Sequence, residues 1–437
     1  MNSTDARRRL AILLAAALAV LGYMIIWTRF KPVVFANTHS DFSCFYRAGR
    51  MVIEGDASRV YDLAAERQFD RRLGTNFVDG KGESFSLPFV FPPYSLAVFA
   101  PLACLPLRTA ELAWYVINIG MLLALPFALR WRRQWKDQTI AAELLAPLLF
   151  LPAVLALMQG QPSILLLLLL ALVFAALSQG QDARAGMALA FVTLKPQLVL
   201  PMLLALVVWR KWKALAAFAW TSIALLGVSV AVVGQSAVLD YPGALMRFNH
   251  LAGSLGGEHP ESMPNLRGGL YLLLQDRCSG KAVAGITMAL SVFLLVALAM
   301  LLKRHVTPSP AAYSLTIVVT LVVSYHAYLH DDALLLLPMI LAAQHVFRNR
   351  LTVTRMALMA AIAGLYIIPL LPASLSTTAI EMLVVMVVFS ALLAVELRSE
   401  AKSHQTKAAE PQLARVPHSG LHLARVGLAL ERTAPPQ

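Results

Sequence analysis

The sequence predicts an all-α membrane protein that crosses the bilayer many times, and two observations carry this prediction. Of its 437 residues, 58% are hydrophobic and only 14% are charged, with a mean hydropathy of +0.66. Soluble domains carry about 25% charged residues. The apolar residues also occur in long runs, and runs of about 20 such residues are typical of transmembrane helices. When the basic loops are placed on the cytoplasmic side, these runs predict a bundle of about 12 membrane helices.

The net charge of +13 does not indicate a nucleic-acid partner. Lys and Arg lie mainly in short loops between apolar runs, which is typical of cytoplasmic loops. A basic surface of this kind suits anionic membrane lipid. The three cysteines have neither metal-ligand spacing nor an even count, so we expect no disulfide framework, no metal and no cofactor. Nucleotide-binding motifs are also missing.

The first apolar run covers residues 10–27 and follows three arginines. No small-residue cleavage site ends it, so we predict an uncleaved helix with a cytoplasmic N-terminus. Residues 28–87 are polar and form the first periplasmic loop. Apolar residues recur there at helical spacing (Phe42, Phe45, Tyr46, Met51), which predicts short amphipathic helices on the membrane surface.

Residues 88–107 are apolar but are interrupted by four prolines. The run at 110–129 is a cleaner span, and the basic stretch at 130–136 after it should be cytoplasmic. Only one crossing fits between the outer loop and that stretch. We therefore expect residues 88–107 to re-enter or to lie on the surface, packed on protein.

The remaining spans follow from the same argument. Both flanks of the run at 185–209 look cytoplasmic, so it should form two short helices joined by a turn at Lys195-Pro196-Gln197. A Gly- and Pro-rich second periplasmic loop is expected at 234–281. Other runs occupy 139–157, 164–177, 214–233, 282–302, 312–324, 334–346, 356–371 and 380–394. The membrane domain thus covers 1–397, and the basic cytoplasmic tail, 398–437, is predicted to be disordered.

This topology gathers polar residues from distant parts of the chain on the outer side of the membrane. They are Asp41, Gln161, Lys195, Asn265, Arg267, His326, His330 and Asp331. Asp41 is either a solvated loop acid or a base. Its neighbours Phe42, Phe45 and Tyr46 would desolvate the carboxyl and raise its pKa, which favours a base. The residues alone leave these two interpretations about even.

Lys195 lies in the middle of an apolar run and is followed by proline. A lysine that reaches the interface through its alkyl stem is the simpler interpretation. A cation at this depth is costly and usually functional, however, and a lipid phosphate is a natural partner for it.

The stretch 325–332 (YHAYLHDD) places two histidines four residues apart. A helix start capped by Asp331 or Asp332 explains one acid. The carboxylate that a zinc-protease motif requires is missing, so hydrogen bonds to phosphate or sugar are favoured, from His330 before His326. Gln161, Asn265 and Arg267 lie in turns. Near a site, the amides would bind sugar hydroxyls and the arginine would bind phosphate.

An ordered set of short motifs resembles glycosyltransferase family 87. The motifs are DFSCFYRAG at 41–49, FPPYSL at 91–96, PLRTAELAW at 106–114, GQPS at 160–163, KPQ at 195–197 and the pair His330-Asp331. The resemblance runs from about the first helix to the last span and leaves out the tail. Residues 325–328 are a departure, because relatives often differ there.

The resemblance implies a GT-C fold and an inverting enzyme that takes a sugar, typically mannose, from a polyprenyl-phosphate donor. The mycobacterial mannosyltransferases that build phosphatidylinositol mannosides are such enzymes. An envelope lipid or glycan would accept the sugar on the outer face of the bacterial inner membrane. The family's catalytic acid maps to Asp41 and its late-loop histidine to His330. We expect Lys195, Arg267 and His326 near the donor phosphate, and Gln161, Asn265, Tyr46 and Asp331 near the sugar or acceptor.

Two other functions stay open at this point. One is a flippase or transporter of lipid-linked sugars, and the other is a non-catalytic subunit of envelope assembly. A transporter needs polar groups through the depth of the bundle. In this sequence they gather on one side, which favours the enzyme.

Overall fold

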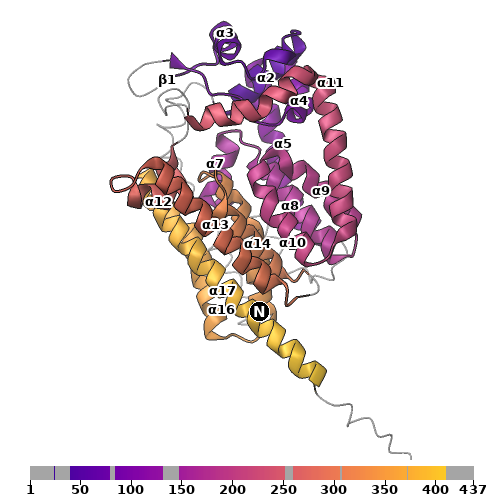
Figure 1. Cartoon of the computed structure of the whole chain (residues 1–437), viewed down its shortest axis with the longest axis vertical. Coiled ribbons are helices and arrows are strands. Elements are labelled where there is room, and N and C mark those ends of the chain that lie inside the picture. Colours follow the sequence, from indigo (N-terminus) through magenta and orange to yellow (C-terminus); the bar gives the residue numbers. More distant parts are fainter. Residues whose placement is uncertain are drawn as a thin grey trace, which may run out of the picture. The chain divides into compact units, whose positions relative to one another are not determined.

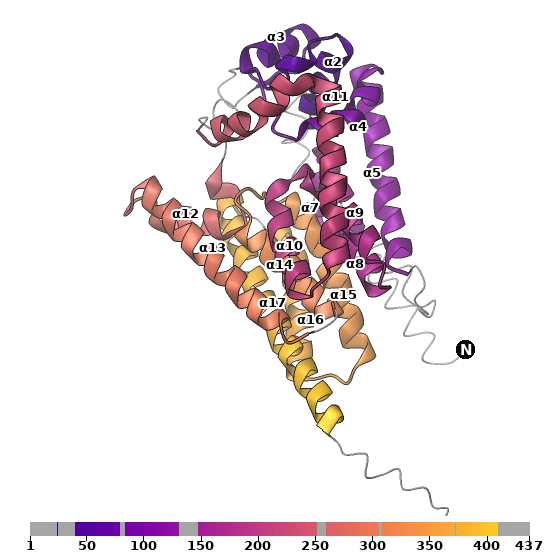
Figure 2. The ribbon, with the colours of Figure 1, turned by 45° about the vertical axis from the view of Figure 1, so that its right-hand side comes forward.

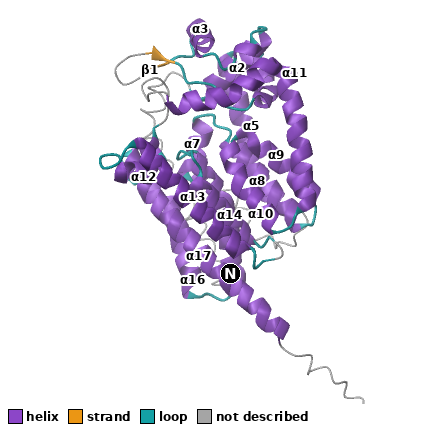
Figure 3. Cartoon of the chain, in the orientation of Figure 1, coloured by secondary structure: helices purple, strands orange, loops and turns teal. Residues whose placement is uncertain are grey.

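A computed structural model of the protein describes Met24 and residues 40–78, 84–130, 147–250, 259–305, 308–371 and 373–409. The predicted first span apart from Met24, the basic stretch from residue 131 and most of the tail lie outside these residues. The described chain is mainly helical, as predicted (Figure 3). Its strands β1 (Phe77–Val78) and β2 (Ser84–Phe85) form one short antiparallel pair. The chain divides into two compact units, Met1–Leu397 and Arg398–Gln437.

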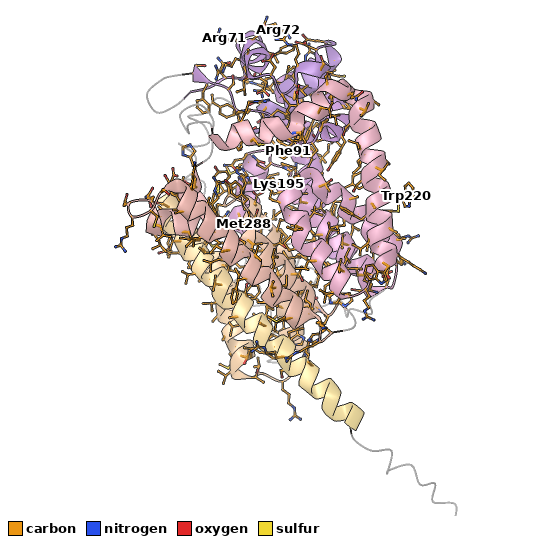
Figure 4. All side chains as sticks on the ribbon, viewed as in Figure 1. Arg71, Arg72, Phe91, Lys195, Trp220 and Met288 are labelled. Atoms are coloured by element: carbon orange, nitrogen blue, oxygen red, sulfur yellow. The ribbon has the colours of Figure 1, made fainter. Side chains whose placement is uncertain are left out.

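Five of the described helices are long and apolar enough to cross a membrane. They are α5 (Leu107–Arg130), α11 (Trp212–His250), α13 (Gly280–Leu302), α16 (Val353–Ile367) with the short η8 (Ile368–Leu370), and α17 (Leu375–Ala409). Large apolar side chains point outward from them, such as Trp220 on α11 and Met288 on α13, which are 73% and 64% exposed (Figure 4). Such faces are suited to lipid. The count of about 12 spans stays a prediction.

Shorter helices fill the space between the long ones. They are α7 (Leu151–Met158), α8 (Ser163–Ser178), α9 (Asp182–Phe191), α10 (Val199–Val208), α12 (Leu266–Leu274), α14 (Pro310–Val323) and α15 (Leu336–Arg348). Every residue of α14 from Ala311 to Val322 is buried. This helix contacts α10, α13 and α15, so it forms the centre of the core.

The predicted helices at the start of the described chain are present, but α2 is not a surface helix. Residues 42–73 form α2 (Phe42–Ile53), η1 (Ala57–Arg59) and α3 (Leu63–Leu73). All of α2 from Phe42 to Gly49 is buried. A Cβ at Gly49 would lie 2.8 Å from the Cβ of Ala103, so glycine lets α2 pack closely on α4 (Leu96–Ala103). The amphipathic pattern could not show this second contact, which covers the face expected to be exposed.

The proline-rich segment does not cross as a single helix, in agreement with the prediction. It forms η2 (Pro93–Ser95) and α4, and the chain then continues into α5. At 1.5 Å per residue, the eight residues of α4 extend roughly 12 Å, whereas a hydrocarbon core is about 30 Å thick.

The run at 185–209 is divided at Lys195, as predicted. Helix α9 leads through η3 (Val192–Leu194) to Lys195, whose backbone is extended (φ −122°, ψ 90°). The chain then forms η4 (Pro196–Leu198) and α10. Proline disfavours the helical conformation of the residue before it, which explains why the break falls at Lys195.

The first part of the segment predicted as the second periplasmic loop, 234–281, is helical, and its place outside the membrane stays a prediction. Helix α11 continues to His250 and only bends at Gly234 (φ 82°, ψ 165°), a conformation that glycine adopts without strain. Figures 1 and 2 show the second leg of α11 (residues 235–250) running beneath α2 and α3. Residues 259–274 form η6 (Pro260–Ser262) and α12. In the predicted tail, residues 398–409 are helical, and disorder stays a prediction for the rest.

Candidate active site

A cavity of about 480 Å³ lies where the start of α2 meets the turns that follow α7, η3 and α14. Its polar side comprises Asp41, Gln161, Lys195, Gln197, His259, Tyr325, His326, Tyr328 and His330. Its apolar side includes Phe91, which Figure 4 labels together with Lys195, and Leu245 and Phe248 of the second leg of α11. Segments separated by up to nearly three hundred residues thus contribute to one site.

Asp41 stands directly before α2 and is half-buried. Gln161 donates a hydrogen bond from Nε2 to Asp41 Oδ2 at 2.7 Å. The contact depends on Gly160, because a Cβ at that position would lie 2.7 Å from the Cβ of Phe42. Burial raises the pKa of Asp41, and the hydrogen bond from Gln161 and the charge of Lys195 offset part of the rise.

Lys195 is 6% exposed and forms an ion pair with Asp331. The Asp331 carboxylate also accepts hydrogen bonds from Ser163 Oγ at 2.7 Å and from the backbone N–H of Tyr328 at 3.3 Å. Burial alone would raise the pKa of Asp331, but the charge of Lys195, the nearby His330 and these hydrogen bonds lower it overall. Asp331 is therefore ionised and holds the lysine in place.

His326 and His330 line the cavity with Lys195. Burial lowers the pKa of His330 to about 3 against the opposing charge of Asp331, so its imidazole is neutral near pH 7. The ring of His326 packs edge-on against Phe248 and Tyr328, with ring centroids 5.5 and 4.9 Å apart. Gln197 donates to the backbone carbonyl of His326 at 3.0 Å, which links the Lys195 turn to the histidine turn.

Four predicted site residues do not line the cavity. Asp331 lies behind Lys195, and the Tyr46 hydroxyl donates to the backbone carbonyl of Leu105 at 3.0 Å. Asn265 is buried, caps α12 by accepting from Gly268 N at 2.8 Å, and donates to the Ala327 carbonyl at 3.4 Å. The Arg267 guanidinium lies 3.8 Å from the centroid of the Tyr325 ring. Asn265 and Arg267 therefore support the turn at 325–328 from outside the cavity.

Several cavity residues had no predicted role. Gln197 lines the cavity and belongs to the KPQ motif at 195–197. Ser163 does not line it, but donates to Asp331 and belongs to the GQPS motif at 160–163. No motif in the sequence indicated a role for Tyr328. Its hydroxyl accepts a hydrogen bond from the backbone N–H of His259 at 2.8 Å. His259 also lines the cavity, and no motif in the sequence indicated this position.

The arrangement suits group transfer from an anionic leaving group. A carboxylate with a raised pKa can take a proton from a hydroxyl, and a fixed cation in the same cavity can stabilise negative charge that develops on a departing group. Within the described ranges, no group of three or more His, Cys, Asp and Glu side chains could hold a metal ion.

Comparison with known proteins gives one match. The model of glycosyltransferase family 87 matches residues 89–324. No curated protein and no solved structure matches the chain. The matched region includes Gln161 and Lys195, whereas Asp41, His326 and His330 lie beyond its two ends. It covers more than half of the 437 residues, and this membrane protein therefore belongs to glycosyltransferase family 87.

Proposed function

We propose that the protein transfers mannose from a polyprenyl-phosphate donor to a lipid or glycan of the cell envelope, on the outer face of the bacterial inner membrane. The observation that carries the proposal is the single cavity that contains both the Asp41 carboxyl and the Lys195 ammonium. Transfer from a phosphate-linked sugar requires a base for the acceptor and a cation for the phosphate.

Asp41 is the proposed base. Its Oδ2 accepts from Gln161, while Oδ1 has no hydrogen-bond partner among the described residues. The Oδ1 atom would take the proton of an acceptor hydroxyl as that oxygen attacks the anomeric carbon. The new carbon–oxygen bond forms on the face opposite the breaking bond to phosphate, so configuration inverts. A β-linked donor then yields an α-linked product.

Lys195 and His330 are the proposed donors to the phosphate. One N–H of Lys195 is used by Asp331, which leaves its other N–H groups for phosphate oxygens. The neutral His330 offers a ring N–H without adding charge to the site. His326 lines the same side, and Arg267 adds positive charge behind Tyr325. Polyprenyl phosphate is already a good leaving group, so no general acid is needed.

The apolar part of the cavity is the proposed entry for the lipid chain of the donor. Leu194 and Pro196, which flank Lys195 in the chain, line it together with Leu245 and Phe248. A hydrocarbon chain attached to a phosphate at Lys195 would find these side chains next to it. Gln161, whose Oε1 is buried without a partner among the described residues, is placed to accept from a sugar or acceptor hydroxyl.

A transfer assay tests the proposal. The purified full chain is given synthetic polyprenyl-phosphate mannose and an envelope lipid extract, and products are identified by mass spectrometry. Polyprenyl-phosphate glucose and a nucleotide-linked mannose are run in parallel. We expect product only from polyprenyl-phosphate mannose and not from the other two donors. Product from the nucleotide sugar alone would show that the donor class is wrong.

Paired variants then test the base. Asp41→Asn should lower transfer by about 10²–10⁴-fold, which is the usual contribution of a general base. Asp56→Asn is the matched control, since Asp56 lies on the same segment outside the cavity and contacts Arg59 at 3.5 Å. Full activity of Asp41→Asn would exclude this residue as the base.

A further inference from the structure

A second cavity, of about 810 Å³, lies between α10 and α13 and shares no residue with the candidate active site. We call it the α10–α13 groove. Its walls are two helical stripes, Leu200, Leu204 and Val208 on α10 and Val292, Val296 and Met300 on α13. Leu200 and Met300 are each 61% exposed, so the stripes are open to the surroundings of the protein.

The length of the groove matches one leaflet of a bilayer. From Val292 to Lys303, the stripe on α13 extends roughly 16 Å at 1.5 Å per residue. The hydrocarbon core of a bilayer is about 30 Å thick, so the groove accommodates the chains of a lipid from one side only.

One end of the groove is basic. Arg210 and Lys303 line it there, both are exposed, and none of the described residues that line the groove is acidic. The neighbouring Lys211, by contrast, is paired with Asp182 at 3.1 Å. No ion pair of Arg210 or Lys303 occurs within the part of the chain that the structure describes. This end lies on the side that the basic loops assign to the cytoplasm.

The backbone at Arg210 is unusual. Its φ of 54° makes it the only non-glycine residue in the left-handed region among those described. The Lys211 N–H bonds to the Leu206 carbonyl at 2.9 Å, which is the helix-ending pattern that normally has glycine at the position of Arg210. An arginine held in a conformation that suits glycine indicates that its side chain has a function.

Trp209 supplies an independent observation. It lines the groove and is 5% exposed, and its indole Nε1 is buried with no acceptor among the described residues. Buried indole N–H groups usually have a hydrogen-bond partner. Among the described residues, Trp209 Nε1 thus has no acceptor at the same end of the groove at which Arg210 and Lys303 have no ion-pair partner.

We propose that the α10–α13 groove binds one anionic glycerophospholipid of the cytoplasmic leaflet. The acyl chains lie along the two apolar stripes, Arg210 and Lys303 bind the phosphate and the anionic headgroup, and Trp209 Nε1 donates to a lipid oxygen. The site is separate from the sugar-transfer cavity, and its existence does not depend on the donor or acceptor proposed above.

Photolabelling of the full chain tests this site. The protein is placed in nanodiscs of phosphatidylethanolamine with a small amount of photoreactive phosphatidylglycerol or, separately, photoreactive phosphatidylcholine. Labelled peptides are mapped by mass spectrometry. We expect labelling of α10 and α13 by phosphatidylglycerol and much weaker labelling by phosphatidylcholine. Equal labelling by both lipids would overturn the proposal.

Variants locate the headgroup. Arg210→Gly combined with Lys303→Gln should weaken phosphatidylglycerol labelling about thirtyfold, since each basic side chain near an anionic surface contributes about a fivefold affinity. Glycine suits the backbone at position 210, so the variant should fold. Lys213→Gln with Arg304→Gln removes the same charge outside the groove and should keep the labelling. Unchanged labelling of the first variant, or displacement of phosphatidylglycerol by polyprenyl phosphate, would show that the occupant is wrong.

Discussion

Two buried cations, Arg47 and Lys195, differ in how completely their partners enclose them. Arg47 is 1% exposed and pairs with Asp70 at 2.6 Å and Glu66 at 2.9 Å. It also donates to the Leu87 carbonyl at 2.8 Å. Lys195 is 6% exposed, pairs with a single acid, Asp331, and lines the cavity beside Asp41.

The difference separates a structural charge from a candidate functional one. Arg47 joins α2 to α3, and its two acids are inside the protein with it. Burial raises the pKa of Glu66 to about 7 although Arg47 opposes the rise, so the cluster balances its charge internally. Lys195, by contrast, lines the cavity and has N–H donors in addition to the one that Asp331 accepts. Burial alone does not distinguish the two roles, whereas the number of partners and access to a cavity do.

The largest expected effect comes from removing the enclosed cation. Arg47→Met leaves Glu66 and Asp70 buried without it, which should destabilise the protein by about 3–5 kcal/mol. Thermal unfolding of the purified chain in detergent measures this loss. The triple variant Arg47→Met, Glu66→Gln, Asp70→Asn should recover most of it. An unchanged unfolding temperature of Arg47→Met would remove the distinction between the two clusters.

Removing the cation at the cavity should act mainly on the reaction. Lys195→Met should lower transfer by about 10²–10³-fold, the scale of one lost electrostatic contact to a transition state. Its stability loss should be smaller than that of Arg47→Met, because Asp331 keeps Ser163 and the Tyr328 N–H. Lys195→Met with Asp331→Asn should regain stability without regaining transfer. Recovered transfer in the double variant would show that Lys195 is structural.

The pH dependence of transfer tests Asp41 directly. Its pKa is raised by burial, so the active carboxylate should be lost as pH falls through a value above the ordinary 3.8. The stability of the protein should change in the opposite direction, because the ionised Asp41 is buried and stability therefore falls as pH rises through that pKa. At neutral pH, Asp41→Asn should unfold at the same or a higher temperature than the unmodified protein. His330 has a pKa of about 3 and should not contribute near neutrality.

Gln161 provides a finer test within the same pH profile. Gln161→Leu removes the hydrogen bond that stabilises the ionised Asp41, so the acid limb should move to higher pH by about one unit. A variant that lowers the rate equally at every pH would indicate that Gln161 binds substrate and does not tune Asp41.

The smallest effect is expected at Asp332, next to Asp331. Both oxygens of Asp332 are buried without a partner among the described residues, and burial and the charge of Asp331 raise its pKa well above the usual range. Asp332→Asn keeps the size of a side chain whose charged form is disfavoured by burial, and it should change stability by less than about 1 kcal/mol. Asp331→Asn is the contrast, since it removes the partner of Lys195 and should lower transfer in the same assay.

Local patterns in the sequence predicted local features correctly. The composition predicted a helical membrane protein, and five described helices are long and apolar enough to span a bilayer. The proline after Lys195 predicted the break between α9 and α10, because proline restricts the residue before it. The sequence did not predict that α11 continues through residues 235–250 or that α17 continues through residues 398–409. A bend at a glycine and the extension of an apolar helix both leave only weak local patterns in the sequence.

The sequence by itself predicted which polar residues gather on one side of the membrane, because hydropathy and the basic loops assign each helix end to a side. It could not determine which of them meet. That depends on close contacts between distant segments, such as Gly160 against Phe42, which brings Gln161 to Asp41. Only the tertiary structure therefore placed Asp41, Lys195 and His330 around one cavity and assigned Asn265 and Arg267 to its support.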